Sequence, residues 1–333
     1  MTTHYPKISI ITPSYNQGQY IEQTILSVIE QGYPNLEYII IDGQSTDNSI
    51  AIIQKYEKYL SYWTSEKSLG QSDAINKGLQ RATGEIINWL NSDDYYEPQT
   101  LFKVAQTFMN TQAKVVCGRS RIFKDNQTLY FSQGTDVYPN NLAKTIGWAR
   151  IDQPETFFHH SAIEKMGLLD NRLHYLMDRD WWIKYLLHFG LNHIQKIPDL
   201  LVNFRLHENS KTVSKAKLFD KEHHDIFYAI AKQAKLKKYQ YFIQNFFNIN
   251  PYFELHNFPP IEPELAERIL NYYVLLKANE FYVENDKATT QAFLNFVNID
   301  LLEKEDRELY KILNFRNRYI PIFLLELGRR LFR

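Results

Sequence analysis

Two adjacent carboxylates, Asp93 and Asp94, follow a short apolar run over residues 86–90. A run of this length, with Gly84 before it and polar residues after it, is typical of a buried strand. The carboxylates would then lie at the carboxyl end of that strand, where open α/β sheets bind their ligands. Hard oxygen ligands suit Mg²⁺ or Mn²⁺, and Mg²⁺ is commonly held by carboxylates together with substrate phosphates. The pair therefore predicts a divalent-metal site, the alternative being a polar turn that caps a helix near Pro98.

The elements that would position these carboxylates alternate between strand and helix patterns. This alternation indicates an α/β fold with a mostly parallel sheet flanked by helices. The predicted strands cover residues 7–12, 36–41, 62–65 and 86–90, and the predicted helices cover 20–31, 50–60 and 70–82. Because the carboxyl ends of parallel strands share one edge, we expect Asp42, Asp93 and Asp94 to face a common ligand.

The ligand expected at this edge contains a nucleoside. An Asp at the end of a second strand, here Asp42, commonly accepts hydrogen bonds from a nucleoside. No glycine-rich phosphate-binding loop follows the first strand, and the P-loop pattern is absent from the sequence. The phosphates must then be held by something else, and a metal ion on Asp93 would do so.

The middle of the chain is less regular, and the end is helical. Short strands are predicted over residues 115–118, 121–123, 129–132, 156–158 and 200–206, with helices over 161–166 and 179–189. Residues 124–127 read as a hairpin turn. Beyond about residue 215 the sequence is helical and rich in aromatic residues, with a linker over 250–260.

Length and composition narrow the class of protein. A chain of 333 residues exceeds the usual size of a single core, so one domain with an appended module is expected. Lys plus Arg and Asp plus Glu number 38 each, so no overall field favours nucleic acid as a partner. The single cysteine, Cys117, excludes an intramolecular disulfide, fits a reducing compartment and is interpreted as a buried strand residue.

The two ends of the chain bear on location. The first residues lack the pattern of a secretory signal, and no apolar window is long enough to span a membrane. A cytoplasmic protein is expected. Residues 315–333 are apolar and contain five arginines and one glutamate, which predicts a helix that contacts a membrane surface. A terminal helix docked on its own domain is an equal alternative.

Five motifs together resemble the family 2 glycosyltransferases of GT-A fold. They are Pro13-Ser-Tyr-Asn16, Asp42-Gly-x-Ser45-x-Asp47, Glu66-x-x-x-Gly70-x-x-Asp73-Ala-x-Asn76-Lys77-Gly78, Ala82-Thr-Gly84 and Leu90-Asn-Ser-Asp-Asp94. Their order and spacing match over residues 6–212, and the resemblance is closest to the bacterial branch that builds surface polysaccharides. It implies a GT-A (Rossmann-like) catalytic domain over residues 1–214 and leaves a helical extension over 215–333.

The resemblance also implies a nucleotide-sugar site with Mn²⁺ or Mg²⁺ as its cofactor. Asp93 matches the metal-binding position, and His207 follows the last core strand, where a His can approach the metal or the diphosphate. The chain departs from the commonest pattern at Asn91, where the first Asp of the metal motif often stands. The residues that would contact the nucleotide sugar are Pro13, Tyr15, Asn16, Asp42, Asp73, Lys77, Asn91, Asp94, Arg205 and Lys211.

An acceptor side with a catalytic base is implied by two further segments. Residues 153–158 and 175–182 are similar to acceptor-side segments of the family, in which an acid at the start of a tryptophan-bearing helix serves as base. Asp178 is the first candidate and Asp180 the second. Inversion at the anomeric carbon needs such a base, because the attacking hydroxyl must lose its proton. The alternative is that both are acids favoured by the helix dipole.

The function implied is an inverting, metal-dependent transfer of a sugar from a nucleotide sugar to a hydroxyl of a glycan or lipid-linked glycan. A uridine donor is the commonest expectation for such a family, and a homodimer is an open alternative for the helical tail. A sugar nucleotidyltransferase would carry a glycine-rich loop with basic residues, and residues 13–18 have none. A processive synthase is disfavoured because spanning helices and a Gln-x-x-Arg-Trp motif are missing. A non-catalytic nucleotide-sugar-binding module stays open.

Overall fold

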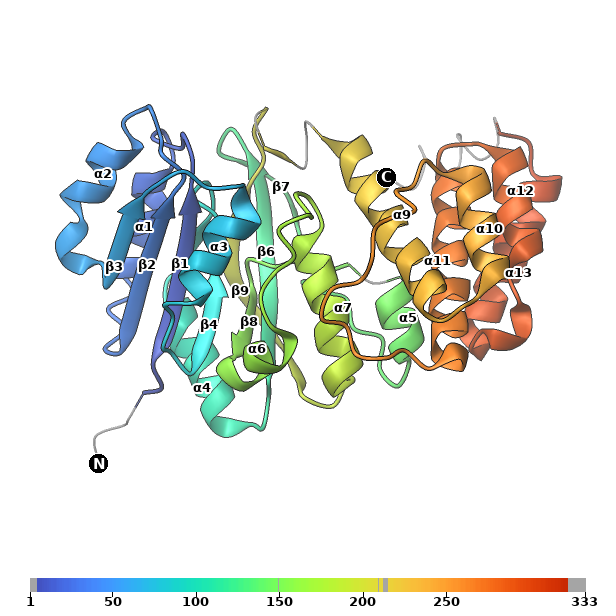
Figure 1. Ribbon diagram of the computed structural model, residues 1–333, viewed down its shortest axis with the longest axis horizontal. Coiled ribbons are helices and arrows are strands. Elements are labelled where there is room, and N and C mark those ends of the chain that lie inside the picture. The colour runs from blue at the N-terminus through green and yellow to red at the C-terminus, as the bar shows by residue number, and fades with distance from the viewer. Residues whose placement is uncertain (1–4, 149, 209, 212–214, 323–333) are drawn as a thin grey trace. The chain divides into compact units, whose positions relative to one another are not determined.

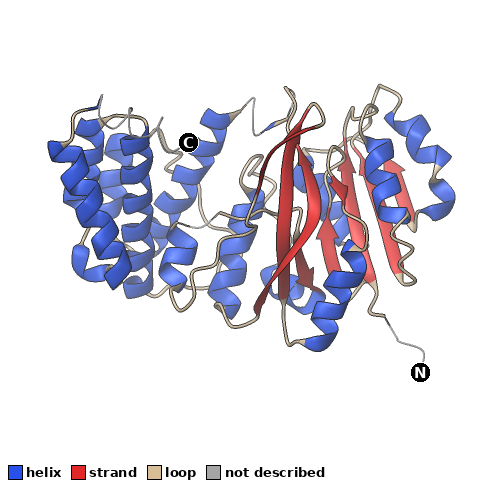
Figure 2. Cartoon of the chain, turned by 180° about the vertical axis from the view of Figure 1, so that it is seen from behind, coloured by secondary structure: helices blue, strands red, loops and turns tan. Residues whose placement is uncertain are grey.

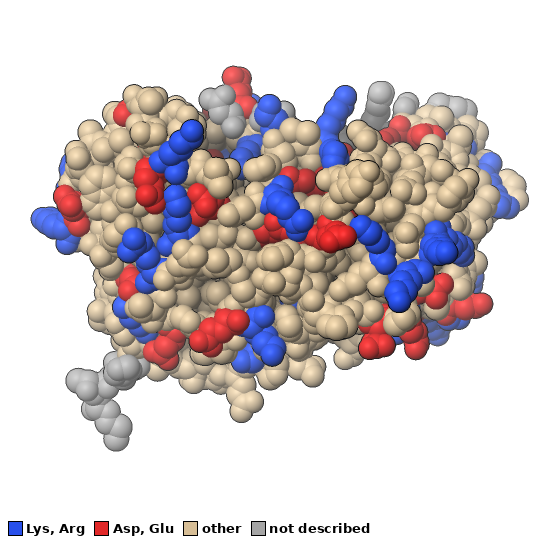
Figure 3. All heavy atoms as spheres, viewed as in Figure 1, with Lys and Arg blue, Asp and Glu red and all other residues tan. Residues whose placement is uncertain are grey.

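The computed structural model describes residues 5–148, 150–208, 210–211 and 215–322. The chain divides into two compact units. The first comprises Met1–Val137, Arg150–His223 and His256–Pro259, and the second comprises Tyr138–Ala149, His224–Leu255 and Pro260–Arg333. All strands belong to the first unit, whereas the second is helical (Figures 1 and 2). On the face drawn in Figure 3, acidic and basic side chains are interspersed.

Alternating strands and helices build the first half of the sheet. They are β1 (Ile8–Ser14), α1 (Ile21–Ile29), β2 (Leu36–Asp42), α2 (Ser49–Lys55), β3 (Tyr62–Ser65), α3 (Gln71–Leu79) and β4 (Ile86–Trp89). Strand β1 is parallel to both β2 and β4, and β3 is parallel to β2. Every residue of β1 is buried, as expected for a central parallel strand covered on both faces. The predicted α/β class is confirmed.

The second half of the sheet is mixed. Its elements are β5 (Tyr95–Tyr96), α4 (Thr100–Asn110), β6 (Val115–Lys124), β7 (Gln127–Phe131), β8 (Thr156–His159), α6 (His160–Met166), α7 (Met177–Phe189) and β9 (Ile194–Arg205). Strand β8 lies between β4 and β6 and is antiparallel to both, whereas β9 is parallel to β6 and antiparallel to β5. The parallel arrangement predicted for the sheet therefore applies to β1–β4.

Strands β6 and β9 are longer than the sequence patterns indicated. The two short strands predicted over 115–118 and 121–123 are one strand, since Arg119 and Ser120 between them pair with β9. Strand β9 begins before Pro198. Its register with β6 shifts between Lys196 and Leu200, so Pro198 lies in an irregular stretch of the strand. Prolines are tolerated in sheets at such bulges. Cys117 is fully buried in β6, as predicted.

The second unit consists of helices. They are α5 (Leu142–Gly147), the later part of α9 (Ala216–Gln233), α10 (Lys237–Phe246), α11 (Pro263–Val283), α12 (Lys287–Phe296) and α13 (Lys304–Tyr319). The predicted boundary after residue 214 stays a prediction; the first compact unit extends to His223. In the described part of the chain, no helix has the length and apolarity that a membrane crossing requires. Of the predicted membrane-contacting segment 315–333, residues 323–333 lie outside the described residues.

Helix α5 was not predicted, and a polar network fixes it in the second unit. The ammonium of Lys144 is 2.6 Å from Oδ1 of Asp306, and the Tyr272 hydroxyl donates to Oδ2 of the same carboxylate at 2.9 Å. The amide of Asn141 donates to the Tyr272 hydroxyl at 2.9 Å. The two contacts made by Asn141 and Lys144 join residues more than a hundred positions apart, so no local pattern could indicate them.

Gly78 allows helix α3 to lie directly against β1. A β-carbon at this position would be 2.4 Å from Cγ2 of Ile11, which is completely buried. We predict that Gly78→Ala lowers the free energy of unfolding. The overpacking cost lies toward the upper end of about 1–3 kcal/mol, and it exceeds the roughly 1 kcal/mol that Ala gains over Gly in a helix.

Urea unfolding followed by circular dichroism measures this effect. Gln80→Ala, at the exposed end of the same helix, is the control and should change stability by about 0.5 kcal/mol or less. Equal stability of Gly78→Ala and the parent protein would show that α3 is not held against β1 by this contact.

Candidate functional site

A pocket of about 1490 Å³ opens in the first unit at the carboxyl ends of β1 and β4. It is larger than the roughly 300–1,000 Å³ of a typical small-ligand site, so it has room for two ligands. Its wall includes residues 13–17, 43–44, 46, 67–71, 91–94, 150–155, 174–179, 204–206 and 210–211. The loops after β1, β2 and β4 therefore converge on one pocket, together with the start of α7 and the segment after β9.

Asp93 and His207 form a pair at one part of this site. Oδ2 of Asp93 lies 3.0 Å from Nε2 of His207, and the His207 ring packs against Tyr20 with 4.9 Å between centroids. A carboxylate oxygen and an imidazole nitrogen are both ligands that Mn²⁺ accepts. Among the described residues, no group of three or more His, Cys, Asp or Glu side chains is arranged to hold a metal ion.

Asp94 lies behind Asp93 and is 1% exposed. Its Oδ1 accepts a hydrogen bond of 2.9 Å from the backbone N–H of Arg205, whereas its Oδ2 has no hydrogen-bond partner. Burial, and next the charge of Asp93, raises the pKa of Asp94 well above its ordinary value. The acidic pair thus consists of one accessible carboxylate and one buried carboxyl group.

The Arg205 side chain holds the turn that contains Asp93 and Asp94. Its Nε donates to the backbone oxygen of Asp93 at 2.9 Å, and a terminal guanidinium nitrogen donates to Gln23 at 2.6 Å. The guanidinium also lies over the rings of Tyr20 and Phe123, 4.7 Å from each centroid. The predicted contact of Arg205 with the nucleotide sugar would therefore come from a side chain that already has several partners.

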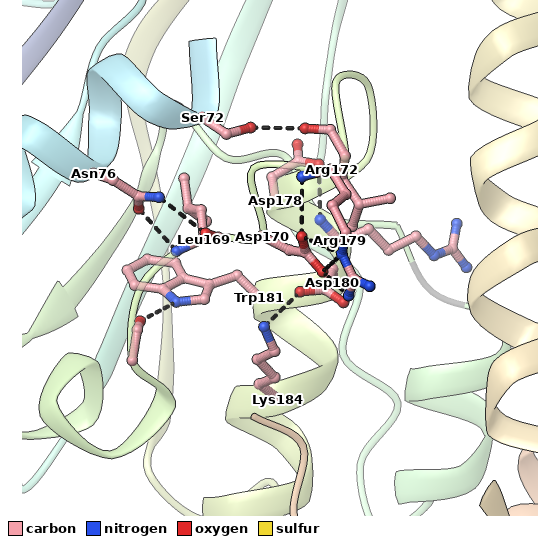
Figure 4. A network of polar contacts seen from close by, with 12 residues as sticks. Ser72, Asn76, Leu169, Asp170, Arg172, Asp178, Arg179, Asp180, Trp181 and Lys184 are labelled. Atoms are coloured by element: carbon pink, nitrogen blue, oxygen red, sulfur yellow. Dashed lines mark hydrogen bonds and ion pairs between the residues drawn. The ribbon is translucent and has the colours of Figure 1, made fainter. Parts of the chain in front are cut away.

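Helix α7 carries both candidate bases, Asp178 and Asp180, and gives them different surroundings (Figure 4). Asp178 lines the pocket, and its Oδ1 accepts a hydrogen bond of 2.7 Å from the backbone N–H of Arg179. Burial raises the pKa of Asp178 to about 6, with a further increase from the charge of Asp152. Asp180 does not line the pocket. It is completely buried, and its Oδ2 is 2.8 Å from the ammonium of the equally buried Lys184.

The predicted nucleotide-contacting loops are tied to each other by their own polar groups. Asp42 is completely buried, and its Oδ2 accepts hydrogen bonds from the Ser45 N–H at 2.8 Å and the Ser65 hydroxyl at 2.7 Å. Asn16 accepts a 2.8 Å bond from the N–H of Thr46. Pro13, Tyr15 and Asn16 line the pocket, whereas Asp42 does not. In this structure Asp42 shapes the loop after β2, and the loop itself forms the pocket wall.

Asp73 and Lys77 also act on a loop. Oδ2 of Asp73 accepts hydrogen bonds of 3.1 Å from the Leu69 N–H and the Ser68 hydroxyl. The ammonium of Lys77 is 3.1 Å from Glu66 and 3.5 Å from Asp73. Neither Asp73 nor Lys77 lines the pocket, but residues 67–70 of the loop that they hold do.

Gln71 joins two predicted residues and was missed by the sequence analysis. Its Nε2 donates to Oδ1 of Asn91 at 2.7 Å, and its Oε1 accepts a 2.8 Å bond from Lys211. Lys211 donates in turn to the backbone oxygen of His174 at 2.9 Å, and burial lowers the pKa of this lysine. A neutral glutamine carries little signal in a sequence, although its place between Gly70 and Asp73 in a family motif was available.

Glu222 on α9 was also missed. Its carboxylate accepts three backbone hydrogen bonds, from His174 at 2.8 Å, Tyr175 at 2.9 Å and Leu176 at 2.8 Å. These residues form the turn that leads into Asp178. No local pattern could have indicated Glu222, because it lies 46 to 48 residues away along the chain.

The first unit has a GT-A fold. Residues 9–163 match the profile of Glycosyl transferase family 2. Residues 1–349 of S. aureus TarS superpose with a TM-score of 0.58 at 18% identity, over 93% of this chain and 88% of that one. Residues 9–163 of this chain are therefore similar to the family 2 glycosyltransferases, and the superposition with TarS shows a shared fold.

Sequence relatives point the same way. An uncharacterized glycosyltransferase of Rickettsia typhi is 28% identical over 222 residues, which are 63% of this chain and 67% of the relative. TuaG of Bacillus subtilis, a glycosyltransferase named for teichuronic acid biosynthesis, is 41% identical over 114 residues, which are 33% of this chain and 44% of TuaG.

We predict that Glu222→Ala slows sugar transfer by about tenfold to a hundredfold, because small misplacements of a catalytic group carry costs of this order. The substitution removes three charge-assisted bonds that hold the turn before Asp178, and Glu222→Gln should have a smaller effect because it keeps one acceptor oxygen. Steady-state kinetics should show the loss in kcat, with the donor KM nearly unchanged.

Lys217→Ala, exposed on the same helix, is the matched control for this measurement. A Glu222→Ala enzyme with normal kcat would refute the positioning role. A parallel loss of folded protein, measured by circular dichroism, would instead assign Glu222 to stability alone.

Proposed function

We propose that this protein is an inverting, metal-dependent glycosyltransferase. It transfers a sugar from a nucleotide sugar to a hydroxyl of a glycan or lipid-linked glycan during surface polysaccharide synthesis. The observation that carries the proposal is one pocket lined by both Asp93, which is paired with His207, and Asp178. The Asp93–His207 pair suits the leaving group, and the Asp178 carboxyl group suits the attacking hydroxyl.

The donor would bind against the loops after β1 and β2. Tyr15 is 61% exposed in this part of the wall and offers an aromatic surface to a base. The TarS structures include complexes with UDP and with UDP-GlcNAc. These complexes support a nucleotide-sugar donor for the same fold, and we propose a uridine nucleotide for this protein.

Mn²⁺ or Mg²⁺ would be held by Asp93 and His207. Two protein side chains leave most of the coordination shell to diphosphate oxygens and water, which is common for Mg²⁺ at phosphate sites. The unpaired Oδ2 of Asp94 indicates a further polar position in the same turn. When bound, the cation would supply positive charge to the leaving nucleoside diphosphate. Lys211, the second predicted cation besides Arg205, lines the same pocket.

Asp178 would be the base. The acceptor oxygen forms a bond to the anomeric carbon while the bond from that carbon to the diphosphate oxygen breaks, and the electron pair leaves with the nucleoside diphosphate. The hydroxyl proton passes to Asp178, whose pKa of about 6 leaves it ionised at neutral pH. Asp180 is the weaker candidate because its carboxylate is paired with Lys184 away from the pocket.

The setting of the acceptor is proposed from two observations. The relative TuaG, named for teichuronic acid biosynthesis, supports a role in surface polysaccharides. Helix α13 exposes Leu309, Ile312, Phe315 and Tyr319, an apolar face that suits contact with a membrane surface or with a second copy of the chain. A cytoplasmic enzyme acting on a lipid-linked glycan at the membrane accounts for both.

We predict that Asp93→Asn and Asp178→Asn lose transfer for different reasons. UDP with Mn²⁺ should raise the melting temperature of the parent protein and of Asp178→Asn, because a ligand that binds the folded state stabilises it. It should not do so for Asp93→Asn. Both variants should lose at least about a hundredfold in the rate of UDP release from the matching nucleotide sugar.

The control is Asp125→Asn in the exposed turn between β6 and β7, which should behave as the parent protein in both assays. Full turnover by Asp93→Asn and Asp178→Asn would overturn the assignment. Release of pyrophosphate from a nucleoside triphosphate would favour a nucleotidyltransferase instead.

We also predict an acid limb in the pH profile of kcat near pH 6. The carboxylate form of Asp178 is the active base, and its pKa of about 6 means that the protonated form prevails below that pH. The rate should therefore fall about tenfold for each pH unit below the midpoint and level off above pH 7. The limb should disappear from the residual activity of Asp178→Asn, and a limb that persists there would assign it to another group.

A further inference from the structure

Another acidic residue, Glu155, lines the pocket and has no part in the chemistry described above. Glu155 directly precedes β8 and is completely buried. Apart from approaches by its own backbone N–H and by the Ser120 hydroxyl, neither of its carboxyl oxygens has a hydrogen-bond partner among the described residues. An unpaired polar group in a protein interior costs free energy, and native proteins rarely keep one without a reason.

The charged neighbours of Glu155 are engaged with each other. Nε of Arg150 is 3.0 Å from Oδ1 of Asp152, and Oδ2 of Asp152 accepts a short hydrogen bond from Ser132. Arg150 also donates to the Ser132 hydroxyl at 3.1 Å. In the described contacts the guanidinium thus pairs with Asp152, and Glu155 is left without a cation.

Burial without an ion-pair partner among the described side chains favours the neutral form of the Glu155 carboxyl group. Burial, and next the charge of Asp152, raises the pKa of Glu155 well above its ordinary value. A protonated carboxyl group presents one O–H donor and one carbonyl acceptor side by side. Such a pair can bind a neutral hydroxyl, which also both donates and accepts, without the cost of burying a charge.

The surrounding wall adds a surface that suits a sugar ring. Tyr130 on β7 lines the same pocket and is 55% exposed. An exposed aromatic ring packs against the apolar C–H face of a sugar while polar groups beside it bind the hydroxyls. Asp178, the proposed base, lines the same pocket.

We propose that Glu155 is a specificity-determining residue that hydrogen-bonds a hydroxyl of the acceptor sugar, in a subsite bordered by Tyr130 and Asp152. This proposal rests on the function proposed above, because it assigns the acceptor half of the same pocket. The subsite selects a neutral, hydroxyl-bearing acceptor. A site built to bond a hydroxyl discriminates strongly against ligands that lack it, since its own polar groups are then left unpaired.

The test separates binding from stability with Glu155→Gln and Glu155→Met. Methyl β-D-glucopyranoside is the probe, and its binding is followed by saturation-transfer NMR in the presence of UDP and Mn²⁺. We expect a signal with the parent protein and with Glu155→Gln, which keeps a donor and an acceptor. We expect at least about a tenfold weaker signal with Glu155→Met, corresponding to one lost buried hydrogen bond.

The loss of glucoside binding should not be accompanied by a loss of stability. Glu155→Met replaces an unpaired carboxyl group with an apolar side chain of similar length, so its melting temperature should equal or exceed that of the parent protein. Its thermal shift with UDP and Mn²⁺ should be unchanged. Glu164→Met, on the exposed side of α6, is the control and should leave glucoside binding intact.

Three outcomes would overturn the proposal. They are equal glucoside signals from all variants, no signal from the parent protein, and a lower melting temperature of Glu155→Met with normal binding, which would make Glu155 structural. Binding of ethanolamine in place of the glucoside would assign an ammonium ligand and also reject a hydroxyl subsite. Failure of the parent protein to bind UDP or any nucleotide sugar, with glucoside binding intact, would instead reject the proposed function.

Discussion

The contact between Asp94 and the end of β9 is the constraint on which the site depends. Oδ1 of Asp94 accepts from the N–H of Arg205, and the Arg205 side chain returns to the backbone oxygen of Asp93. The turn after β4, in the parallel half of the sheet, is thereby fixed to the last strand of the mixed half. Asp93 and His207 can meet only because these two chain segments, more than a hundred residues apart, are held together.

The other side of the pocket is built by the same principle, with a carboxylate that organises backbone. Glu222 fixes the turn before α7, and the direction in which each side chain leaves α7 then determines which acid faces the pocket. Residues two apart on a helix point in different directions, so Asp178 reaches the pocket while Asp180 turns into the core toward Lys184. The spacing of Asp180 and Lys184, four residues apart, is the sequence signal that could have distinguished the two acids.

The sequence was sufficient for the features that depend on local order. Strand ends, the polar loops after them and the family motifs located Asp93, Asn16 and Asp178 near one pocket, because parallel strands place their carboxyl ends on one edge. The direction of β8 and the position of α5 could not be predicted from the sequence, since both depend on contacts with distant segments. Glu222 was missed for the same reason.

Hydrogen-bond satisfaction distinguishes the acids that shape the wall from those that face ligands. Asp42 and Asp73 each accept several hydrogen bonds from their own loops, so they need no ligand to offset their burial. Asp94 and Glu155 are buried with carboxyl oxygens that lack partners, and both line the pocket. Because unpaired buried oxygens are costly, this combination of an unpaired oxygen and a place in the pocket wall is the basis on which ligand contacts are proposed for Asp94 and Glu155.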